Sequence, residues 1–128
     1  MVLPAKFRDR VQGGCYLTKV LDGCLAIYTP EEFKTRSEEM MEKARRGQKE
    51  RNMVRTFFAS TAEVVPDRQG RIAIPAPLRE FAQLERELKI IGAMNRIEIW
   101  NKDDWIDINI QAEEAMRSPE PVLDDLGI

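Results

Sequence analysis

The chain has 128 residues, which is enough for one compact domain or for two very small ones. Its net charge of −2 argues weakly against nucleic-acid binding, because DNA-binding proteins usually carry a basic excess; any DNA function therefore requires local clustering of basic side chains. The sequence contains no histidine, which excludes Ser-His-Asp and Cys-His catalysis, and no apolar run of membrane-spanning length.

No sequence pattern indicates an enzyme. A glycine-rich phosphate-binding loop is missing, and the adjacent carboxylates of Asp103 and Asp104 have no convergent partner in the sequence. We therefore expect a soluble, cytoplasmic protein without catalytic activity. We also expect no cofactor, no bound metal, no small-molecule substrate and no membrane partner.

The first third of the chain predicts a short helix, a hairpin and a second helix. Strands are expected near residues 16–20 and 25–28, on either side of turn residues 21–23. The following residues, 29–32 (Thr-Pro-Glu-Glu), form a capping pattern with proline at the first helical position. Cys15 and Cys24 lack metal-ligand spacing, so we expect both thiols to pack as small apolar side chains.

The charged stretch 34–55 is predicted to be a helix that joins two units rigidly, because apolar Phe33, Met40 and Ala44 recur at helical spacing. Its basic residues suggest a DNA-binding patch or, in the interpretation that we favour, a solvated helix face or a subunit contact. These residues are Lys43, Arg45, Arg46, Lys49, Arg51 and Arg55.

The next segment predicts strand, turn, strand and short helix. Residues 62–65 are rich in β-branched side chains, and residues 66–70 (Pro-Asp-Arg-Gln-Gly) have the composition of a turn. Residues 71–74 alternate, with Ile72 and Ile74 on one face of a strand. Pro75 suits the start of a helix, whose buried face is expected to carry Leu78, Phe81 and Ala82.

A second hairpin and a closing helix follow. Strands are predicted at residues 88–91 and 97–100, about a turn at 92–96, and Asn101 is the expected N-cap of the closing helix. Residues 117–128 are expected to form a flexible tail. The apolar stripe of the helix is predicted to contain Trp105, Ile108, Ala112 and Met116.

Two segments of the chain repeat in the same order. Residues 3–8 (Leu-Pro-Ala-Lys-Phe-Arg) match residues 74–79 (Ile-Pro-Ala-Pro-Leu-Arg), and residues 25–33 match residues 97–105. The chain is therefore interpreted as a tandem duplication. The expected division is a first unit at 1–33, a helical connector at 34–58, a second unit at 59–116 and the tail.

Residues 65–76, with the pattern Asp-x-x-Gly-Arg-(apolar)-x-(apolar)-Pro, resemble the MraZ family within the AbrB-like swapped-hairpin regulators. The resemblance implies a mainly β fold with short helices, in which the tandem units interlock as an internal pseudo-dimer and form a double-split β-barrel. It also implies a ring-shaped homo-oligomer that binds direct repeats in double-stranded promoter DNA. The resemblance further implies that the protein lies at the nucleoid and regulates the division and cell-wall operon, with repression as the expected direction.

The resemblance makes Arg71 the leading DNA contact. Its planar guanidinium can meet a phosphate or a guanine edge, while Asp67 and Gly70 are expected to shape the turn. From the residues alone, an alternative is that Asp67 and Arg71 form only a stabilising ion pair. The other predicted DNA-binding residues are Arg68, Arg79, Lys6 and Arg8.

The first unit departs from the pattern, because the counterpart of the 66–71 turn falls before Met1. We expect the first unit to be truncated at its N-terminus, through a misassigned start codon or as a natural short form that binds DNA poorly. The alternative function is an antitoxin-like protein-interaction module of the same fold.

Overall fold

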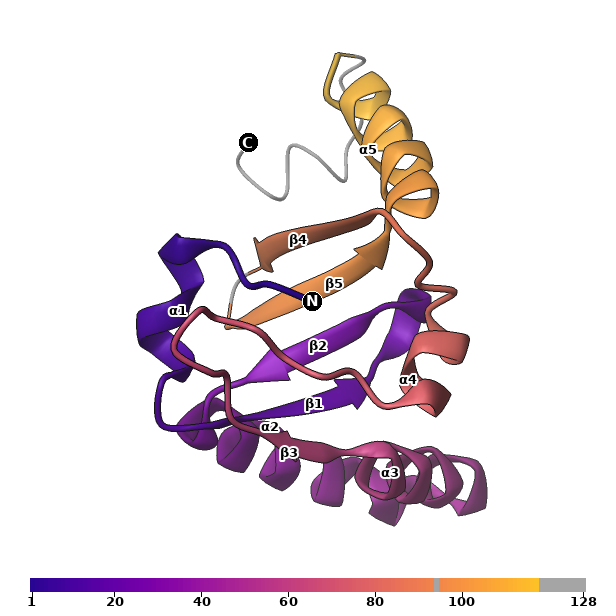
Figure 1. Ribbon diagram of the computed structural model, residues 1–128. Coiled ribbons are helices and arrows are strands. Elements are labelled where there is room, and N and C mark those ends of the chain that lie inside the picture. The colour runs from indigo at the N-terminus through magenta and orange to yellow at the C-terminus, as the bar shows by residue number, and fades with distance from the viewer. Residues whose placement is uncertain (94, 118–128) are drawn as a thin grey trace.

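The computed structural model describes residues 1–93 and 95–117, which form a five-stranded antiparallel sheet with helices (Figure 1). The helices are α1 (Ala5–Val11), α2 (Pro30–Lys43), α3 (Gln48–Ser60), α4 (Ala76–Phe81) and α5 (Lys102–Arg117). The strands are β1 (Cys15–Lys19), β2 (Leu25–Tyr28), β3 (Ala62–Val64), β4 (Leu88–Ala93) and β5 (Arg96–Asn101). None of the helices in the described ranges is both long and apolar enough to cross a membrane.

The sheet has the strand order β3-β1-β2-β5-β4, and each neighbouring pair is antiparallel. Two hairpins, β1–β2 and β4–β5, are joined edge to edge by the pairing of β2 with β5. β3 lies beside β1 although it follows the helical connector, so a strand from the second half of the chain completes the sheet of the first half. The two units therefore share one sheet.

The registers relate the two repeats to each other. Ala26 lies opposite Glu98, its counterpart 72 residues later, and the flanking pairs are symmetric about this position. Met1 and Ile72, which are 71 residues apart, exchange two backbone hydrogen bonds of 2.7 and 3.0 Å. A local twofold axis that relates the two repeats would produce both of these registers. Within the described residues the sheet ends at β3 and β4, so its closure into a barrel stays a prediction.

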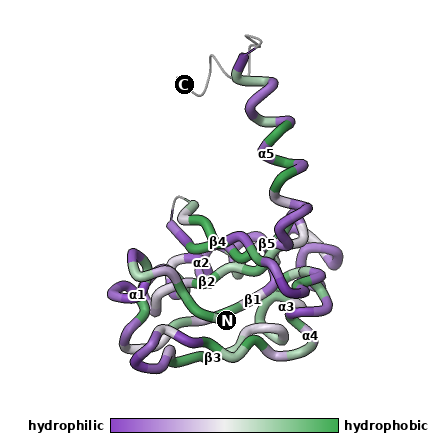
Figure 2. Tube along the Cα trace, turned by 45° about the horizontal axis from the view of Figure 1, so that its top comes forward, coloured by the Kyte–Doolittle hydropathy of each residue, from purple (hydrophilic) through white to green (hydrophobic). Residues whose placement is uncertain are grey.

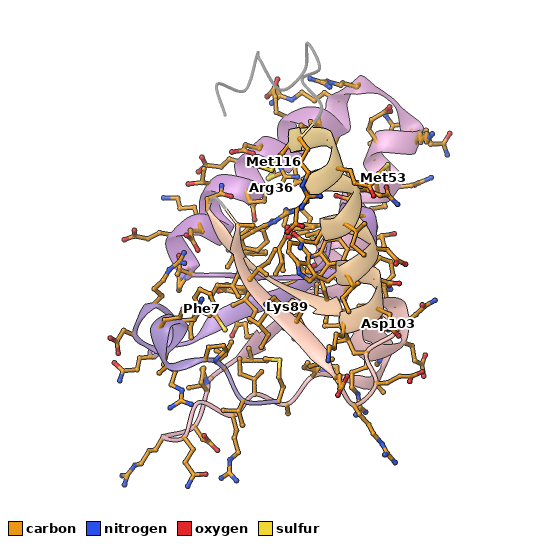
Figure 3. All side chains as sticks on the ribbon, turned by 90° about the horizontal axis from the view of Figure 1, so that it is seen from above. Phe7, Arg36, Met53, Lys89, Asp103 and Met116 are labelled. Atoms are coloured by element: carbon orange, nitrogen blue, oxygen red, sulfur yellow. The ribbon has the colours of Figure 1, made fainter. Side chains whose placement is uncertain are left out.

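The main core lies between the sheet and the two short helices. Phe7 and Val11 of α1 are buried, and so are their counterparts, Leu78 of α4 and Ala82 directly after it. Phe7 extends from α1 to β4, where a Cβ atom on Gly92 would lie 3.1 Å from its ring (Figure 3). The buried members of this core are Leu3, Phe7, Val11, Cys15, Leu17, Leu25, Ile27, Ile72, Leu78, Ala82, Ile97 and Ile99.

Three expectations for the second unit need correction. Phe81 is 40% exposed, because α4 ends at this residue and only one turn of the helix faces the core. Residues 71–74 do not form the predicted strand: they pair at a single bridge, Val2 with Arg71, and Pro75, which has no backbone N–H, follows directly. The turn of the second hairpin is shorter than predicted, because Ala93 pairs with Arg96.

The connector is helical as predicted, but it is a helical hairpin rather than one helix. Gly47 has extended backbone angles, φ 164° and ψ −178°, between α2 and α3. The hairpin packs through an aromatic cluster in which the Phe33 ring stacks on Tyr16 and Phe57 at centroid distances of 4.2 and 5.9 Å. This second core also buries Ala26 and Tyr28 of β2.

α5 projects away from the sheet (Figure 1; Figure 2). The predicted cap is confirmed: the Asn101 Oδ1 accepts a 3.1 Å hydrogen bond from the Asp104 backbone N–H. The predicted apolar stripe is not covered, since Ile108 and Met116 are 40% and 55% exposed and no residue of the helix is buried. Residues 118–128 of the expected tail lie outside the described residues.

Candidate nucleic-acid interface

Asp67 organises the turn that the sequence pattern singled out. Its Oδ1 accepts hydrogen bonds from the backbone N–H groups of Gln69 at 2.8 Å and Arg71 at 2.9 Å. Its Oδ2 accepts from the Arg71 Nε at 2.6 Å, and two backbone hydrogen bonds close the turn between Asp67 and residues 70 and 71. One carboxylate therefore determines both the shape of the turn and the direction of the Arg71 side chain.

These contacts stabilise the ionised form of the Asp67 carboxyl. The hydrogen bonds from the Arg71 backbone and side chain hold the pKa of the Asp67 carboxyl below its usual value. The Arg71 side chain remains 61% exposed, and its two terminal nitrogens form no hydrogen bond with the described residues. Arg71 is thus held through Nε while its outer edge remains available to a ligand.

Gly70 allows the turn to lie against the first unit. Its φ is +77°, and a Cβ atom there would overlap the Arg8 guanidinium. The Arg8 Nε donates a 2.9 Å hydrogen bond to the Leu3 carbonyl, and the Leu3 N–H donates to the Gly70 carbonyl at 2.8 Å. Half-buried Arg8 therefore has a structural role, in addition to whatever contact its terminal nitrogens make.

The predicted DNA-binding residues do not all come together. Arg68 and Arg71 are exposed on the turn, which lies beside α1 with Lys6 and Arg8 (Figure 1). Arg79 is exposed on α4, which lies at the other end of β1, away from the turn. Sequence reasoning omitted Gln69, which is exposed at the tip of the turn; its place between Arg68 and Gly70 was the available signal.

The acidic net charge of the chain, which argues against DNA binding, does not apply to the surface around the turn. The turn and α1 carry more basic than acidic side chains, although the whole chain is acidic. Such clustering is the electrostatic requirement for contact with phosphates. The basic residues are Lys6, Arg8, Arg10, Arg68 and Arg71, and the acidic residues are Asp9 and Asp67. Arg10 is engaged by Glu32 at 2.8 Å.

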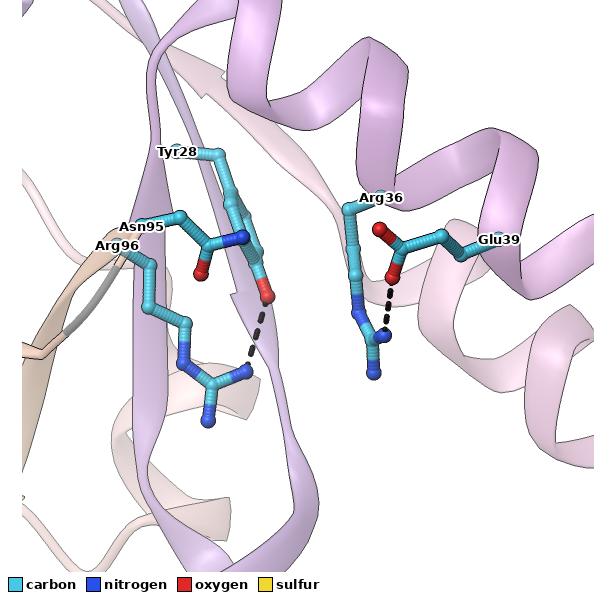
Figure 4. A pocket seen from close by; sticks show the side chains of 5 residues that line it. All are labelled: Tyr28, Arg36, Glu39, Asn95 and Arg96. Atoms are coloured by element: carbon cyan, nitrogen blue, oxygen red, sulfur yellow. Dashed lines mark hydrogen bonds and ion pairs between the residues drawn. The ribbon is translucent and has the colours of Figure 1, made fainter. Parts of the chain in front are cut away.

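A polar pocket of about 530 Å³ lies on another part of the molecule, lined by Tyr28, Arg96 and Arg36 among others (Figure 4). Arg96 donates to the Tyr28 hydroxyl at 3.0 Å and pairs with Glu98, which is itself 8% exposed. Burial alone would lower the pKa of Arg96, but these hydrogen bonds outweigh it and the pKa is raised.

The polar groups around Glu98 in this pocket satisfy one another, whereas the buried Arg36 Nε has no hydrogen-bond partner among the described residues. Glu98 also accepts a 3.0 Å hydrogen bond from the Trp100 indole nitrogen, so both of its carboxylate oxygens are engaged. We interpret the network as structural support for the β2–β5 pairing. Across residues 1–93 and 95–117, no three His, Cys, Asp or Glu side chains are grouped to hold a metal ion.

Comparison with known proteins places the chain in a family. Residues 57–124 match the family model described as "MraZ protein, putative antitoxin-like". The chain is 37% identical over 124 residues to the transcriptional regulator MraZ of Micrococcus luteus, covering 96% of this chain and 87% of that protein. It is 38% identical to the transcriptional regulator MraZ of Desulfitobacterium hafniense strain Y51 over all 128 residues, which cover 90% of that protein.

A third relative has higher identity over a shorter span. The transcriptional regulator MraZ of Frankia casuarinae is 45% identical over 105 residues, covering 82% of this chain and 73% of that protein. These matches agree with the resemblance carried by residues 65–76. The chain belongs to the MraZ family of transcriptional regulators.

Proposed function

We propose that this chain binds double-stranded promoter DNA, with the 66–71 turn as its principal contact, and represses transcription of the division and cell-wall operon. The observation that carries the proposal is the arrangement at Asp67. One carboxylate oxygen holds the turn backbone and the other holds the Arg71 Nε, while the Arg71 side chain remains 61% exposed. A preoriented guanidinium loses little freedom when it binds a base edge or a phosphate.

The remaining basic side chains have supporting roles in this proposal. Arg68 and Lys6 are exposed and suit phosphate contacts, which set the register of a protein on a duplex. Arg8 positions the turn through its hydrogen bond to the Leu3 carbonyl and its close approach to Gly70. Arg79 lies away from this surface, so in the proposal it contacts DNA only if the duplex extends past α4.

The proposal includes a ring-shaped homo-oligomer at the nucleoid. A ring multiplies weak contacts by avidity, which offsets the acidic balance of each chain. It also includes the double-split barrel, with an interlocked first unit at 1–33, a connector at 34–58 and a second unit at 59–116. The symmetric registers at Ala26–Glu98 and Met1–Ile72 support this interlocking.

The test is a fluorescence-anisotropy titration of a duplex from upstream of the gene, at two salt concentrations. We expect Arg71→Ala to weaken binding by about tenfold or more, because a guanidinium contact to a base contributes about 1–3 kcal/mol. Arg45→Ala, a change at an exposed arginine of the connector, is the control and is expected to leave affinity within about twofold. Equal affinities for wild type and Arg71→Ala would remove Arg71 from the DNA interface.

A second candidate is an antitoxin-like protein-interaction module. The description of the family model contains that term, and α5 exposes Ile106, Ile108 and Ile110. Failure to bind any duplex from the promoter, together with binding to the protein product of a neighbouring gene, would favour this second function.

A further inference from the structure

α5 presents an apolar stripe that the chain itself does not cover. Ile106 and Ile110, one helical turn apart, are 41% and 50% exposed. By helical geometry Asp103, Asp107 and Glu114 flank this stripe, and these three carboxylates form no ion pair with the described residues. In Figure 3, Asp103 and Met116 mark the two ends of the helix. The stripe therefore combines apolar and acidic character.

A groove with the opposite charge lies between α2, α3 and the turn after β1. It has a volume of about 850 Å³, and its apolar lining includes Val20, Met40 and Phe57. Met53 of α3, 46% exposed, also lines it. Its basic rim includes Lys43, Arg46 and Lys49, none of which pairs with an acidic side chain among the described residues.

We propose that the Ile106–Ile110 stripe of one chain docks into the α2–α3 groove of a second copy. Helix-in-groove recognition uses apolar anchors at this spacing, and unpaired charges of opposite sign set the orientation. Three carboxylates lie beside the stripe and three cations lie on the rim, and none of the six forms an ion pair within residues 1–93 and 95–117. Apolar burial and charge pairing thus favour the same contact.

The contact joins different chains. α5 extends from the β4–β5 end of the sheet, whereas α3 lies at the opposite end of the molecule (Figure 1). A helix of one chain in the groove of the next is a head-to-tail contact, which generates a closed ring when the rotation closes. The inference rests on the self-association in the proposed function, names the surfaces that produce it, and is independent of DNA binding.

Reciprocal charge reversal tests the pairing by sedimentation velocity. Lys43→Glu/Lys49→Glu in the groove and Asp107→Lys/Glu114→Lys on α5 are each expected to weaken association about tenfold or more. The chain carrying all four substitutions is expected to recover the wild-type oligomer. Lys34→Glu/Arg45→Glu, which makes the same charge change on α2 and η2 (Ala44–Arg46) outside the groove, is the matched control and is expected to have no effect.

A cross-link provides a second measurement that does not depend on the charged variants folding. A chain with Ile110→Cys is mixed with an affinity-tagged chain with Met53→Cys and mildly oxidised. We expect a disulfide-linked pair containing both chains, because the two native cysteines are buried. Ala112→Cys, on the opposite side of α5, is the control and is expected to give little product with Met53→Cys.

Several results would overturn the contact. These are a monomeric wild-type chain, reversal variants that sediment like wild type, failure of the fourfold variant to recover, or equal cross-linking from positions 110 and 112. The DNA titration of Arg71→Ala separates this inference from the proposed function. If Arg71→Ala loses DNA binding but keeps the wild-type oligomer, the result bears only on the turn. If a groove or α5 variant changes the oligomer while Arg71 is intact, the result bears only on the α5 contact.

Discussion

At the scale of single residues, Asp67 and Gly70 support the same turn in different ways. Asp67 accepts hydrogen bonds from two backbone amides and one guanidinium, so the turn is held by one side chain. Gly70 supplies a positive φ and leaves space for Arg8 from the other unit. The turn therefore depends both on its own backbone conformation and on its contact with the first unit.

Gly70→Ala is expected to destabilise the protein by about 1–2 kcal/mol from the left-handed backbone alone, and further because Arg8 must move. Urea unfolding followed by circular dichroism measures the change. Gly13→Ala is the control, since nothing lies within 4 Å of its Cβ position and its φ is not positive. Equal midpoints for the two variants would contradict the role assigned to Gly70.

The two cysteines are expected to resist thiol reagents in the folded protein. Burial raises the pKa of the Cys15 thiol to about 11, and burial together with the Glu98 charge raises that of Cys24 to about 12. Both thiols therefore stay protonated at pH 8 and should label slowly with an aromatic disulfide, then rapidly in urea. An exposed thiol introduced by Met41→Cys, at a position 61% exposed and outside the α2–α3 groove, should label at once, and native cysteines that react at that rate would contradict their burial.

At the scale of elements, helix starts depend on short-range capping. Thr29 and Glu32 form a reciprocal capping box at the start of α2, with hydrogen bonds of 3.0 and 3.2 Å. Asn101 caps α5, 72 residues later, through one hydrogen bond, which its Oδ1 accepts from the Asp104 N–H at 3.1 Å. The repeat has thus preserved the function of the cap while the residue types differ.

Thr29→Ala is expected to lower the free energy of unfolding by about 1 kcal/mol, because the Glu32 backbone N–H loses its acceptor. Thermal unfolding at a fixed protein concentration gives the change in midpoint. Thr35→Ala, at an exposed position inside α2, serves as the control and should be neutral or slightly stabilising, since alanine has the higher helix propensity. A Thr29 variant as stable as the Thr35 variant would show that the cap contributes nothing.

At the scale of the whole molecule, the two units cannot be separated without loss of shared structure. β3 pairs with β1, β2 pairs with β5, and Met1 pairs with Ile72. The main core contains residues from both repeats, including Phe7 and Leu78. Neither half has a complete sheet or core of its own, which predicts a single cooperative unfolding transition.

Leu25→Ala in the first unit tests that cooperativity. Leu25 is fully buried opposite Ile99, so its truncation is expected to cost about 2–5 kcal/mol. Both tryptophans, Trp100 and Trp105, belong to the second unit and report its unfolding by fluorescence. We expect fluorescence and far-ultraviolet circular dichroism to give coincident, lowered midpoints; an unchanged tryptophan transition would indicate independent units.

Features that depend on neighbouring residues were predictable from the sequence. The caps at Thr29 and Asn101, the 66–70 turn and the start of α4 after Pro75 were expected and are present. Each is determined by hydrogen bonds or dihedral preferences within a few residues, so the information is contiguous in the chain. The tandem repeat was visible for the same reason, because both copies retain the order of these local signals.

The placement of side chains in space was decided by the tertiary structure. Arg8 lies against Gly70, a residue 62 positions later, and no local signal assigns it that role. Phe81 and the stripe of α5 have helical periodicity, but periodicity defines a face without saying what covers it. By itself the sequence determined the local elements, the similarity between the two repeated segments and the conformation of the 66–70 turn. Only the fold decided which basic side chains meet there, because that depends on packing between segments far apart in the chain.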